Sequence, residues 1–501
     1  MYENILKLAE LQDGGELSPT TEEAIALAYA DRHWLELRYV AAWSRWLSHD
    51  GARWNIDDTL HAFDRARDIC REVALECEKS GTASTIASAK TVAAVVRLAS
   101  ADRRLAATVA QWDSNALLFN TGTETAATYD LRTGIGRTPD PLDYITKKTA
   151  CDVAPAGTPH PLWRAFLVRV TGGNTELQQF LQRYVGYCCT GLTTEHTFVF
   201  AYGTGANGKS TFINTLAKIF GNYATVADMG TFIATRAERH PTDLAKLCGA
   251  RLVVAQETQR GRHWDETKIK ALTGGDRMTA RFMRQDFFDF VPTFKLFIVG
   301  NHKPRLSSVD EAMRRRLLLV PFTVQIPPAE RDPELPRKLG AEWPAILRWC
   351  IDGCLEWQRV GLAPPAIVRD ATDAYFADHD TLQQWLDDCT HDAAQAVFTR
   401  TATLFSSWKP WCEERNLKSG SANVLSEALA DRGLQKGTGR WHRPAGLLWY
   451  CHQAEVVCDT RDALSLYYPY DARARNGDNE RPRHVRHKLF QLTGPRSKRE
   501  N

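Results

Sequence analysis

A glycine-rich segment at residues 203–211 matches the pattern G-x-x-x-x-G-K-[ST]. It follows Thr197–Tyr202, which is short, aromatic and β-branched like a buried parallel strand. It precedes Thr211–Phe220, in which apolar side chains recur at helical spacing. A strand, a glycine-rich turn and a helix in this order predict an α/β fold with a loop that cradles nucleotide phosphates, and they argue against an accidental turn. The residues expected to contact ATP are Gly203, Thr204, Gly205, Ala206, Asn207, Gly208, Lys209, Ser210 and Thr211.

Each residue type in this loop has a distinct task. Glycines let successive backbone N–H groups converge on the β-phosphate, and the following helix directs the positive end of its dipole at the same anion. Lys209 is expected to neutralise the β- and γ-phosphate oxygens, and the Ser210 hydroxyl is expected to complete the coordination of Mg²⁺. The sequence therefore predicts ATP and Mg²⁺ as cofactors.

Composition restricts the remaining possibilities. A chain of 501 residues is too long for one ordinary domain and predicts about two to four. The net charge is only +3, from 63 basic and 60 acidic residues, so a nucleic-acid surface must be a local patch or a channel built by assembly. The sequence has no apolar run of about eighteen residues and no signal-peptide pattern, which predicts a cytoplasmic protein without a membrane partner.

The 12 cysteines indicate neither a metal centre nor disulfides. Cys188 and Cys189 are adjacent, and no C-x-x-C pair occurs. Cys350 and Cys354 are one helical turn apart, without a nearby pair of histidines. We therefore expect buried reduced thiols and no structural metal.

The next strand candidate, Arg251–Glu257, is an apolar run that ends in an acid. An acid at the carboxyl end of a parallel strand lies beside the phosphate loop, where it can hold Mg²⁺ or orient the attacking water. Glu257 is thus the candidate general base and, with Ser210, the candidate Mg²⁺ ligand. Gln256 stands where a second acid is common, so one carboxylate must serve both roles. Strand-terminal glutamates are common in all proteins, and it is the place after the loop that favours catalysis here.

The third strand candidate, Phe294–Asn301, ends in an amide. A carboxamide there can hydrogen-bond both the γ-phosphate and the attacking water, which makes Asn301 a candidate catalytic sensor of the bound nucleotide. A turn asparagine that merely ends the strand is an equal alternative on spacing alone.

Between the second and third strands, residues 278–290 are typical of a hairpin with interleaved basic and aromatic side chains and with Arg284 near its tip. Such a hairpin could hold a backbone phosphate and stack on a base, and a solvated turn on an aromatic core is the alternative. Farther on, three arginines at 314–316 precede an apolar strand. One guanidinium could stabilise the transition state on a neighbour's γ-phosphate as an arginine finger, or all three could form a surface charge run.

Taken in order, GTGANGKST, RLVVAQET, KALTGGDRMTAR, FKLFIVGN and DEAMRRRLLLVPF resemble the superfamily 3 helicases, specifically the phage and plasmid primase-helicase family related to poxvirus-type replicative helicases. WLSHDGARW, YDLRTG and FLQRYVGYCCTG resemble the domain that precedes the core in that family. The resemblance implies a AAA+-type P-loop core, a homohexameric ring, a DNA strand in its pore and 3′-to-5′ translocation. It implies an ATP-dependent DNA helicase of phage or plasmid replication in a bacterial host cell. The implied partners are single-stranded or duplex DNA and a replication initiator or primase.

The same resemblance implies roles for individual residues. Arg315 or Arg316 would be catalytic in trans on the adjacent subunit, whereas Arg314 stands where the family often has tryptophan. No obvious cluster of metal-binding acids and histidines precedes Trp46, so we expect a helicase without primer synthesis. The side chains implied to line the pore and bind DNA, which match the family block approximately, are Lys270, Arg281 and Arg284.

The expected organisation has five parts. Residues 1–110 are mainly helical with a hairpin near 46–54, 111–190 form an α+β and helical collar domain, 191–362 form the ATPase core, 370–453 form a winged-helix-like domain, and 454–501 form a basic flexible tail. The winged-helix expectation rests on three helical segments followed by the strand-like Leu447–Tyr450. Such a unit binds duplex DNA or another protein.

Two other functions remain open on sequence alone. An AAA+ ATPase that remodels or loads a protein partner would hydrolyse ATP without regard to DNA. A nucleotide-binding module without turnover would leave Glu257 silent, and the amide at Gln256 is the only support for it.

Overall fold

The computed structural model of the chain describes residues 18–235, 242–256, 261–283, 286–306, 309–389, 399–432, 434–436 and 440–442. The chain forms two compact units, Met1–Asp380 and Thr381–Asn501. The expected start of the C-terminal domain at residue 370 lies ten residues before this boundary. The helix that contains residue 370, α14 (Ala366–His379), belongs to the first unit because its buried face packs on the central sheet.

The first unit is a mixed α/β structure around a parallel five-stranded sheet. Most residues of the four strands β13, β7, β12 and β9 are buried, as parallel strands covered on both faces require, which explains the continuous apolar runs in the sequence. The edge strand β8 is less buried, and 72% of the surface of Val226 is exposed. In spatial order the strands are β13 (Leu317–Pro321), β7 (Phe198–Tyr202), β12 (Lys295–Gly300), β9 (Leu252–Gln256) and β8 (Ala224–Ala227).

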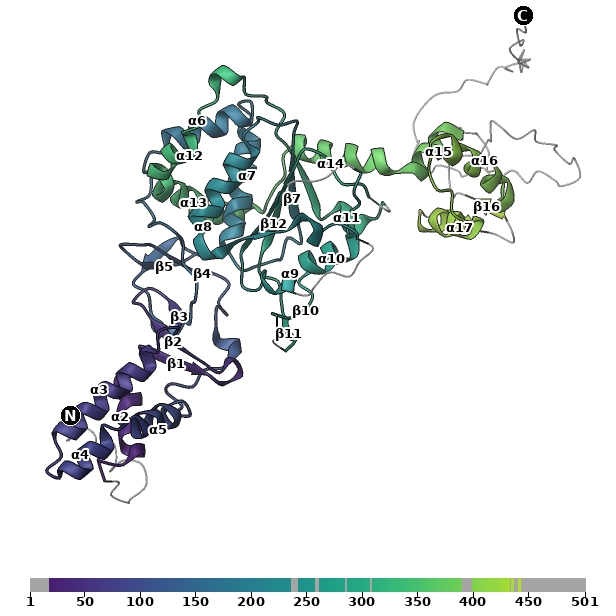
Figure 1. Cartoon of the computed structure of the whole chain (residues 1–501). Helices are drawn as coiled ribbons and strands as arrows, with labels where there is room; N and C mark the ends of the chain where they lie inside the picture. The colour runs from purple at the N-terminus through teal and green to yellow at the C-terminus, as the bar shows by residue number, and fades with distance from the viewer. Residues whose placement is uncertain are drawn as a thin grey trace, which may run out of the picture. The chain divides into compact units, whose positions relative to one another are not determined.

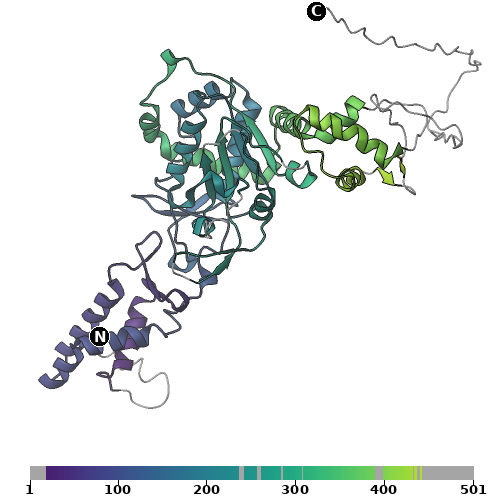
Figure 2. The same ribbon diagram turned by 45° about the vertical axis from the view of Figure 1, so that its right-hand side comes forward.

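Helices cover both faces of this sheet (Figures 1 and 2). Alternate residues of β7 divide between two cores: Val199 and Ala201 belong to one, and Phe198 and Phe200 belong to the other. The first core is closed by α6 (Pro161–Val170), α7 (Thr175–Cys189), α8 (Lys209–Phe220) and α13 (Trp343–Val360). The second is closed by α9 (Thr242–Ala245), α10 (Glu266–Gly274), α11 (Glu311–Arg314) and α14.

Helices and a three-stranded antiparallel sheet begin the described chain. The hairpin of β2 (Arg45–His49) and β3 (Trp54–Ile56) lies where the sequence predicts it, and Gly51 turns it at φ +89°. A third strand, β1 (Leu37–Val40), pairs with β2 and was not predicted. The helices are α2 (Glu22–His33), α3 (His61–Leu75), α4 (Ser80–Ile86) and α5 (Ala89–Ala99).

A second small sheet joins this region to the central sheet. Its strands are β4 (Leu118–Thr121), β5 (Ala127–Asp130) and β6 (Ile135–Arg137). The Asn120 backbone N–H donates to the Tyr223 hydroxyl at 3.0 Å, and the Asn120 amide donates to the Ala52 carbonyl at 2.7 Å. One residue of β4 therefore contacts both the core of the central sheet and the N-terminal hairpin.

Two buried cations fix the carboxyl end of α7. Lys295, at the start of β12, is 1% exposed and donates to the carbonyls of Thr190 and, at 3.1 Å, Leu192. Arg251, just before β9, donates to the carbonyls of Cys189 and, at 2.6 Å, Leu118. Burial lowers the pKa of Lys295 to about 7. Cations suit this place because the last carbonyls of a helix carry partial negative charge.

The contact between α7 and α13 is unusually close. A Cβ on Gly353 would lie 2.2 Å from the Gln182 carbonyl oxygen, and one on Gly186 would lie 2.1 Å from the Cys354 nitrogen. Only glycine allows the two backbones to approach in this way.

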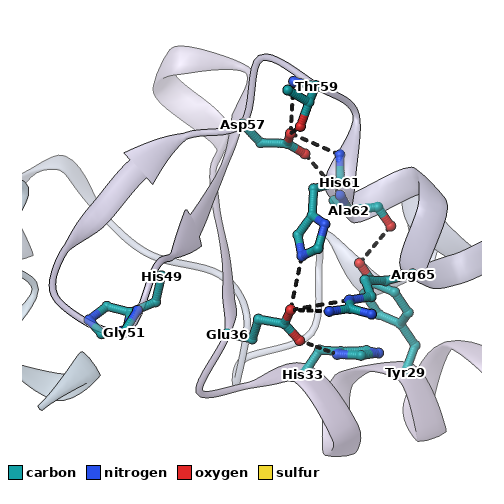
Figure 3. Close-up of polar contacts among 10 residues, drawn as sticks. All are labelled: Tyr29, His33, Glu36, His49, Gly51, Asp57, Thr59, His61, Ala62 and Arg65. Atoms are coloured by element: carbon teal, nitrogen blue, oxygen red, sulfur yellow. Dashed lines mark hydrogen bonds and ion pairs between the residues drawn. The ribbon is translucent and has the colours of Figure 1, made fainter. Parts of the chain in front are cut away.

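Three elements of the N-terminal region meet at Glu36, between α2 and β1 (Figure 3). Its carboxylate accepts from His33 Nδ1 at 2.8 Å, His61 Nε2 at 2.9 Å and Arg65 Nη2 at 2.9 Å. Burial alone would raise the pKa of Glu36, but the hydrogen bonds from His61, His33 and Arg65 outweigh it and lower the pKa to about 2.

In its described residues the second unit contains a small sheet of order β14-β16-β15 and the helices α15 (Thr381–Cys389), α16 (Thr401–Glu414) and α17 (Ala422–Asp431). Its core is formed by Trp385, Trp408, Leu425 and other apolar residues. The strands are β14 (Thr399–Arg400), β15 (Gln435–Lys436) and β16 (Arg440–His442). The predicted strand Leu447–Tyr450 and the predicted tail 454–501 lie outside the described residues.

The remaining elements are short. They are α12 (Leu335–Lys338), the hairpin strands β10 (Met278–Ala280) and β11 (Phe288–Phe290), and the 3₁₀ helices η1 (Ala41–Trp43), η2 (Val109–Gln111), η3 (Pro141–Asp143), η4 (Gly221–Tyr223), η5 (Met229–Thr231), η6 (Pro328–Glu330) and η7 (Leu339–Glu342).

Of the helices in the described ranges, none is long and apolar enough to cross a membrane.

Replacement of Gly353 tests the close helix contact. Gly353→Ala forces α7 and α13 apart, and we expect it to cost about 1–3 kcal/mol, seen as a lower Tm by calorimetry. The control is Gly81→Ala in α4, where an added Cβ meets nothing within 4 Å; that change is expected to be neutral or slightly stabilising. Equal Tm values for the two variants would contradict the packing argument.

The lowered pKa of Glu36 leads us to expect that acid destabilises the N-terminal region. Its folded pKa is below its ordinary value of 4.5, so its stabilising effect is present above pH 4.5 and is lost as the pH falls toward 2. Glu36→Gln should therefore speed amide exchange in α2 and α3 at pH 6, with a difference from wild type that shrinks toward pH 2. Glu72→Gln, which removes an exposed pair with Arg32, is the control and should change little. A pH-independent difference between Glu36→Gln and wild type would argue against the assigned pKa.

Candidate nucleotide and nucleic-acid site

The loop between β7 and α8 has the backbone of a phosphate cradle. Gly205 and Gly208 adopt φ +104° and +81°, and Ala206 adopts φ +49°. A Cβ on Gly203 would lie 2.1 Å from the carbonyl oxygen of Phe322, in the segment that follows β13. Glycine is therefore required both for the turns and for the close approach of these two segments.

Lys209 is the first residue of α8 and is only 4% exposed. Its Nζ donates to the Gly203 carbonyl at 2.9 Å, to Asn207 Oδ1 at 2.8 Å and to Asn301 Oδ1 at 3.3 Å. All three are neutral oxygens, and burial lowers the pKa of Lys209. A buried ammonium that meets no carboxylate among the described residues is stabilised by an incoming anion.

Asn301 directly follows β12, which lies between β7 and β9 in the sheet. The carboxyl ends of these parallel strands share one edge, so Asn301 reaches the lysine of the glycine-rich loop, as the contact with Lys209 shows. Gln256 ends β9 and donates from Nε2 to Asn214 Oδ1 on α8 at 2.7 Å. Glu257, the next residue and the candidate base, lies outside the described residues.

Ser210 and Thr211 open onto a cavity along α8. Its volume is about 500 Å³, and the exposed Ser210 hydroxyl lies at its rim. In the described ranges no three His, Cys, Asp or Glu side chains gather as a metal-binding group. The hydroxyl of Ser210 is of a type that can bind Mg²⁺. The other lining residues are Asn214, Thr215, Ala217, Lys218, Ala224, Thr225, Val226, Pro336 and Trp343.

The three arginines after α11 have different surroundings. Arg314 forms an ion pair with Asp373 of α14 at 2.8 Å. Arg316 is 9% exposed and donates to the Ala312 carbonyl at 2.8 Å, so its guanidinium is held within its own subunit. Arg315 is exposed, and its side chain makes no hydrogen bond or ion pair with the described residues. Of the three, Arg315 is the one whose guanidinium can reach another chain.

The predicted hairpin is formed by β10 and β11, with Met278 opposite Phe290 and Ala280 opposite Phe288. Near its end, Phe282, Met283 and Phe287 are 40%, 70% and 58% exposed. The described end of the hairpin therefore presents apolar surface to solvent.

The cations expected to bind DNA are differently placed. The Arg281 guanidinium lies 4.6 Å from the Phe287 ring. Lys270 forms an ion pair with Asp310, the N-cap residue of α11, and is not on the hairpin. Arg284 lies outside the described residues. The structure therefore brings Arg281 and the exposed aromatic rings together and places Lys270 elsewhere.

Sequence reasoning missed Lys303, in the loop after Asn301. Its Nζ lies 4.1 Å from the ring centroid of Tyr202, the last residue before the P-loop, and burial lowers its pKa. The sequence did contain a signal for Lys303, because a basic residue stands two positions after Asn301, the amide that ends the strand. The role of Asn207 as the donor that holds the Phe322 carbonyl at 2.7 Å was also not predicted.

Two families match separate parts of the chain. The family described as "D5 N terminal like" matches residues 22–172, and a family of unknown function (DUF5906) matches residues 201–316. The first match covers the helices, the hairpin and the small sheet before the core, together with α6. The second begins in β7 and ends just before β13, so it contains the P-loop, Asn301 and the three arginines.

Two viral proteins are similar in sequence. Putative helicase 022R of Frog virus 3 (isolate Goorha) is 26% identical over 256 residues, which are 46% of this chain and 26% of that protein. Putative helicase L207/L206 of Acanthamoeba polyphaga mimivirus is 28% identical over 148 residues, which are 29% of this chain and 15% of that protein. The matches thus span less than a third of either relative.

Solved structures of the NrS-1 C terminal region are also similar. The A form apo structure has a TM-score of 0.47 at 10% sequence identity, covering 83% of this chain and 86% of that one. A second A form apo structure, of residues 305–718, has a TM-score of 0.45 at the same identity and covers 82% and 87%.

Proposed function

Since the chain is a relative of the D5-like primase-helicases, we propose that it is an ATP-dependent DNA helicase of replication. The observation that carries the proposal is the buried ammonium of Lys209, which meets no carboxylate among the described residues and lies in a glycine-rich turn within 3.3 Å of Asn301. Such a cation with converging backbone N–H groups suits the β- and γ-phosphates of ATP. The strand order, with β7 between β12 and β13, supports a AAA+-type core.

Hydrolysis assigns a task to each residue near the loop. Lys209 binds the phosphates, and Asn301 shares a hydrogen bond with Lys209 and orients the attacking water beside it. Glu257 accepts the proton of that water as the general base. Ser210, with Glu257, would hold Mg²⁺, which supplies neutralisation of phosphate charge when bound.

The β10–β11 hairpin is the proposed DNA contact. Exposed Phe282 and Phe287 offer ring faces for base stacking, which is worth about 1–3 kcal/mol per base and tolerates any sequence. Arg281, lying against the Phe287 ring, adds a cation for the backbone phosphates. Arg284 remains a proposed contact on sequence grounds.

We further propose a homohexameric ring. The exposed Arg315 is the preferred arginine finger, because Arg314 and Arg316 are engaged within their own subunit. A guanidinium supplied by a neighbour makes hydrolysis depend on assembly. The 3′-to-5′ direction, a primase or initiator partner and the winged-helix role of the second unit follow from family resemblance alone.

A second function is favoured by one observation. Lys270, expected to line the pore, is ion-paired with Asp310, which leaves fewer free cations for DNA. A AAA+ ATPase that remodels a protein partner has no need of them. The two functions differ in whether DNA stimulates hydrolysis.

ATP hydrolysis with and without single-stranded DNA tests the proposal. We expect stimulation by DNA in the wild type and, in Glu257→Gln, retained nucleotide binding with kcat lowered by about 10²–10⁴-fold, the usual share of a general base. Lys209→Ala should lose nucleotide binding itself. Glu427→Gln, an exposed glutamate of α17, is the control and should behave as wild type. DNA-indifferent hydrolysis would shift the assignment to a protein-remodelling ATPase, and normal turnover in Glu257→Gln would exclude that base.

Mixed assemblies test the arginine finger. Arg315→Ala subunits titrated into wild type should lower ATPase activity more steeply than the wild-type fraction falls, because each variant subunit also disables a neighbour's site. Arg359→Ala, a surface arginine paired with Glu356, is the control and should leave the activity unchanged. A linear decline with Arg315→Ala would place the essential arginine elsewhere.

A further inference from the structure

Helix α14 contacts both of the segments that bear on the bound nucleotide. Thr372 accepts a hydrogen bond from the Leu319 backbone N–H at 3.0 Å, which fastens the helix to the edge strand β13. From this position α14 reaches the loop after Asn301 and the segment that carries Arg315, as the following contacts show.

The first contact holds the Asn301 loop. The Tyr375 hydroxyl donates to the Pro304 carbonyl and accepts from Trp264 Nε1 at 3.0 Å. Tyr375 is 2% exposed, so this carbonyl has a fixed partner out of water. Lys303, in the same loop, lies between the rings of Tyr202 and Tyr375, at 4.1 and 5.7 Å from their centroids.

The second contact holds the arginine segment. Asp373 pairs with Arg314 at 2.8 Å, and the Arg314 guanidinium lies 6.0 Å from the centroid of the buried Phe376 ring. Arg315 is the next residue, and its exposed side chain begins where α11 ends. The residue directly before Arg315 is therefore paired with α14.

We propose that Tyr375 and Asp373 are positioning residues, through which α14 sets the Asn301 loop and the Arg315 segment in the geometry needed for hydrolysis. The inference rests on the proposed ATPase function. Helix α14 ends at His379, just before the second unit begins at Thr381.

The test compares two buried tyrosines whose hydroxyls donate to backbone carbonyls. Tyr375→Phe removes the hydroxyl that donates to Pro304 and accepts from Trp264 Nε1. Tyr29→Phe removes the hydroxyl that donates to the Ala62 carbonyl at 2.8 Å, in the N-terminal region. We expect Tyr375→Phe to lower kcat of the full-length protein roughly tenfold with an unchanged KM for ATP, since misplacement of a catalytic group affects the chemical step. Tyr29→Phe should keep both values.

Asp373→Asn is the second variant, because Asp373 is largely exposed and its loss does not threaten folding. It should lower the DNA-stimulated kcat and leave nucleotide affinity intact. Hydrogen exchange of residues 301–306, measured without nucleotide, gives a readout independent of activity, and it should be faster in Tyr375→Phe than in Tyr29→Phe.

The outcomes distinguish a failure of the positioning role from a failure of the proposed ATPase function. Equal kcat and equal exchange in Tyr375→Phe and Tyr29→Phe would overturn the positioning role. A higher KM for ATP with an unchanged kcat in Tyr375→Phe would overturn the positioning role as well, because that result would indicate weaker nucleotide binding. If the wild type hydrolysed no ATP, the proposed function would fail, and exchange at residues 301–306 would still decide whether α14 holds that loop.

Discussion

The central sheet is joined to the rest of the first unit by two cations buried at the amino ends of adjacent strands. Arg251 and Lys295 bind the last carbonyls of α7, and Arg251 also binds the Leu118 carbonyl of the small sheet. The Arg251 guanidinium lies 4.7 Å from the centroid of Tyr223 as well. These contacts set α7 against the sheet, and α7 in turn fits α13 through paired glycines. Both helices help to close the core beneath the P-loop.

At the other edge of the sheet the chemistry differs. There the carboxyl ends of β7 and β12 bring Lys209 and Asn301 together, and among the described residues the ammonium contacts neutral oxygens. The cations at the amino edge thus bind the chain's own carbonyls, whereas the proposed function assigns the cation at the carboxyl edge to a ligand. This division agrees with the general rule that ligands of α/β sheets bind outside the carboxyl ends of the strands.

Much of the core could be predicted from sequence, because the strands and the P-loop carry local signals. The runs at residues 198–201 and 296–299 are buried on both faces and are therefore apolar throughout. The difference between Arg315 and Arg316 could not be predicted, since it depends on which way a short helix presents neighbouring side chains. The pairing of Lys270 with Asp310, 40 residues away, also depends on the tertiary structure and could not be predicted. The position of α14 could not be predicted from the sequence either, because this helix contacts β13 and two loops that are distant in sequence.

The edge strand β8 has a consequence for the life of the chain before folding is complete. It pairs with β9 on one side only, and Val226 faces solvent. A row of open backbone donors and acceptors beside an apolar side chain is a template on which another nascent chain can add a strand. With only four residues, β8 offers few backbone hydrogen bonds to an added strand. Its shortness is thus a safeguard against aggregation during synthesis, when many copies are made side by side.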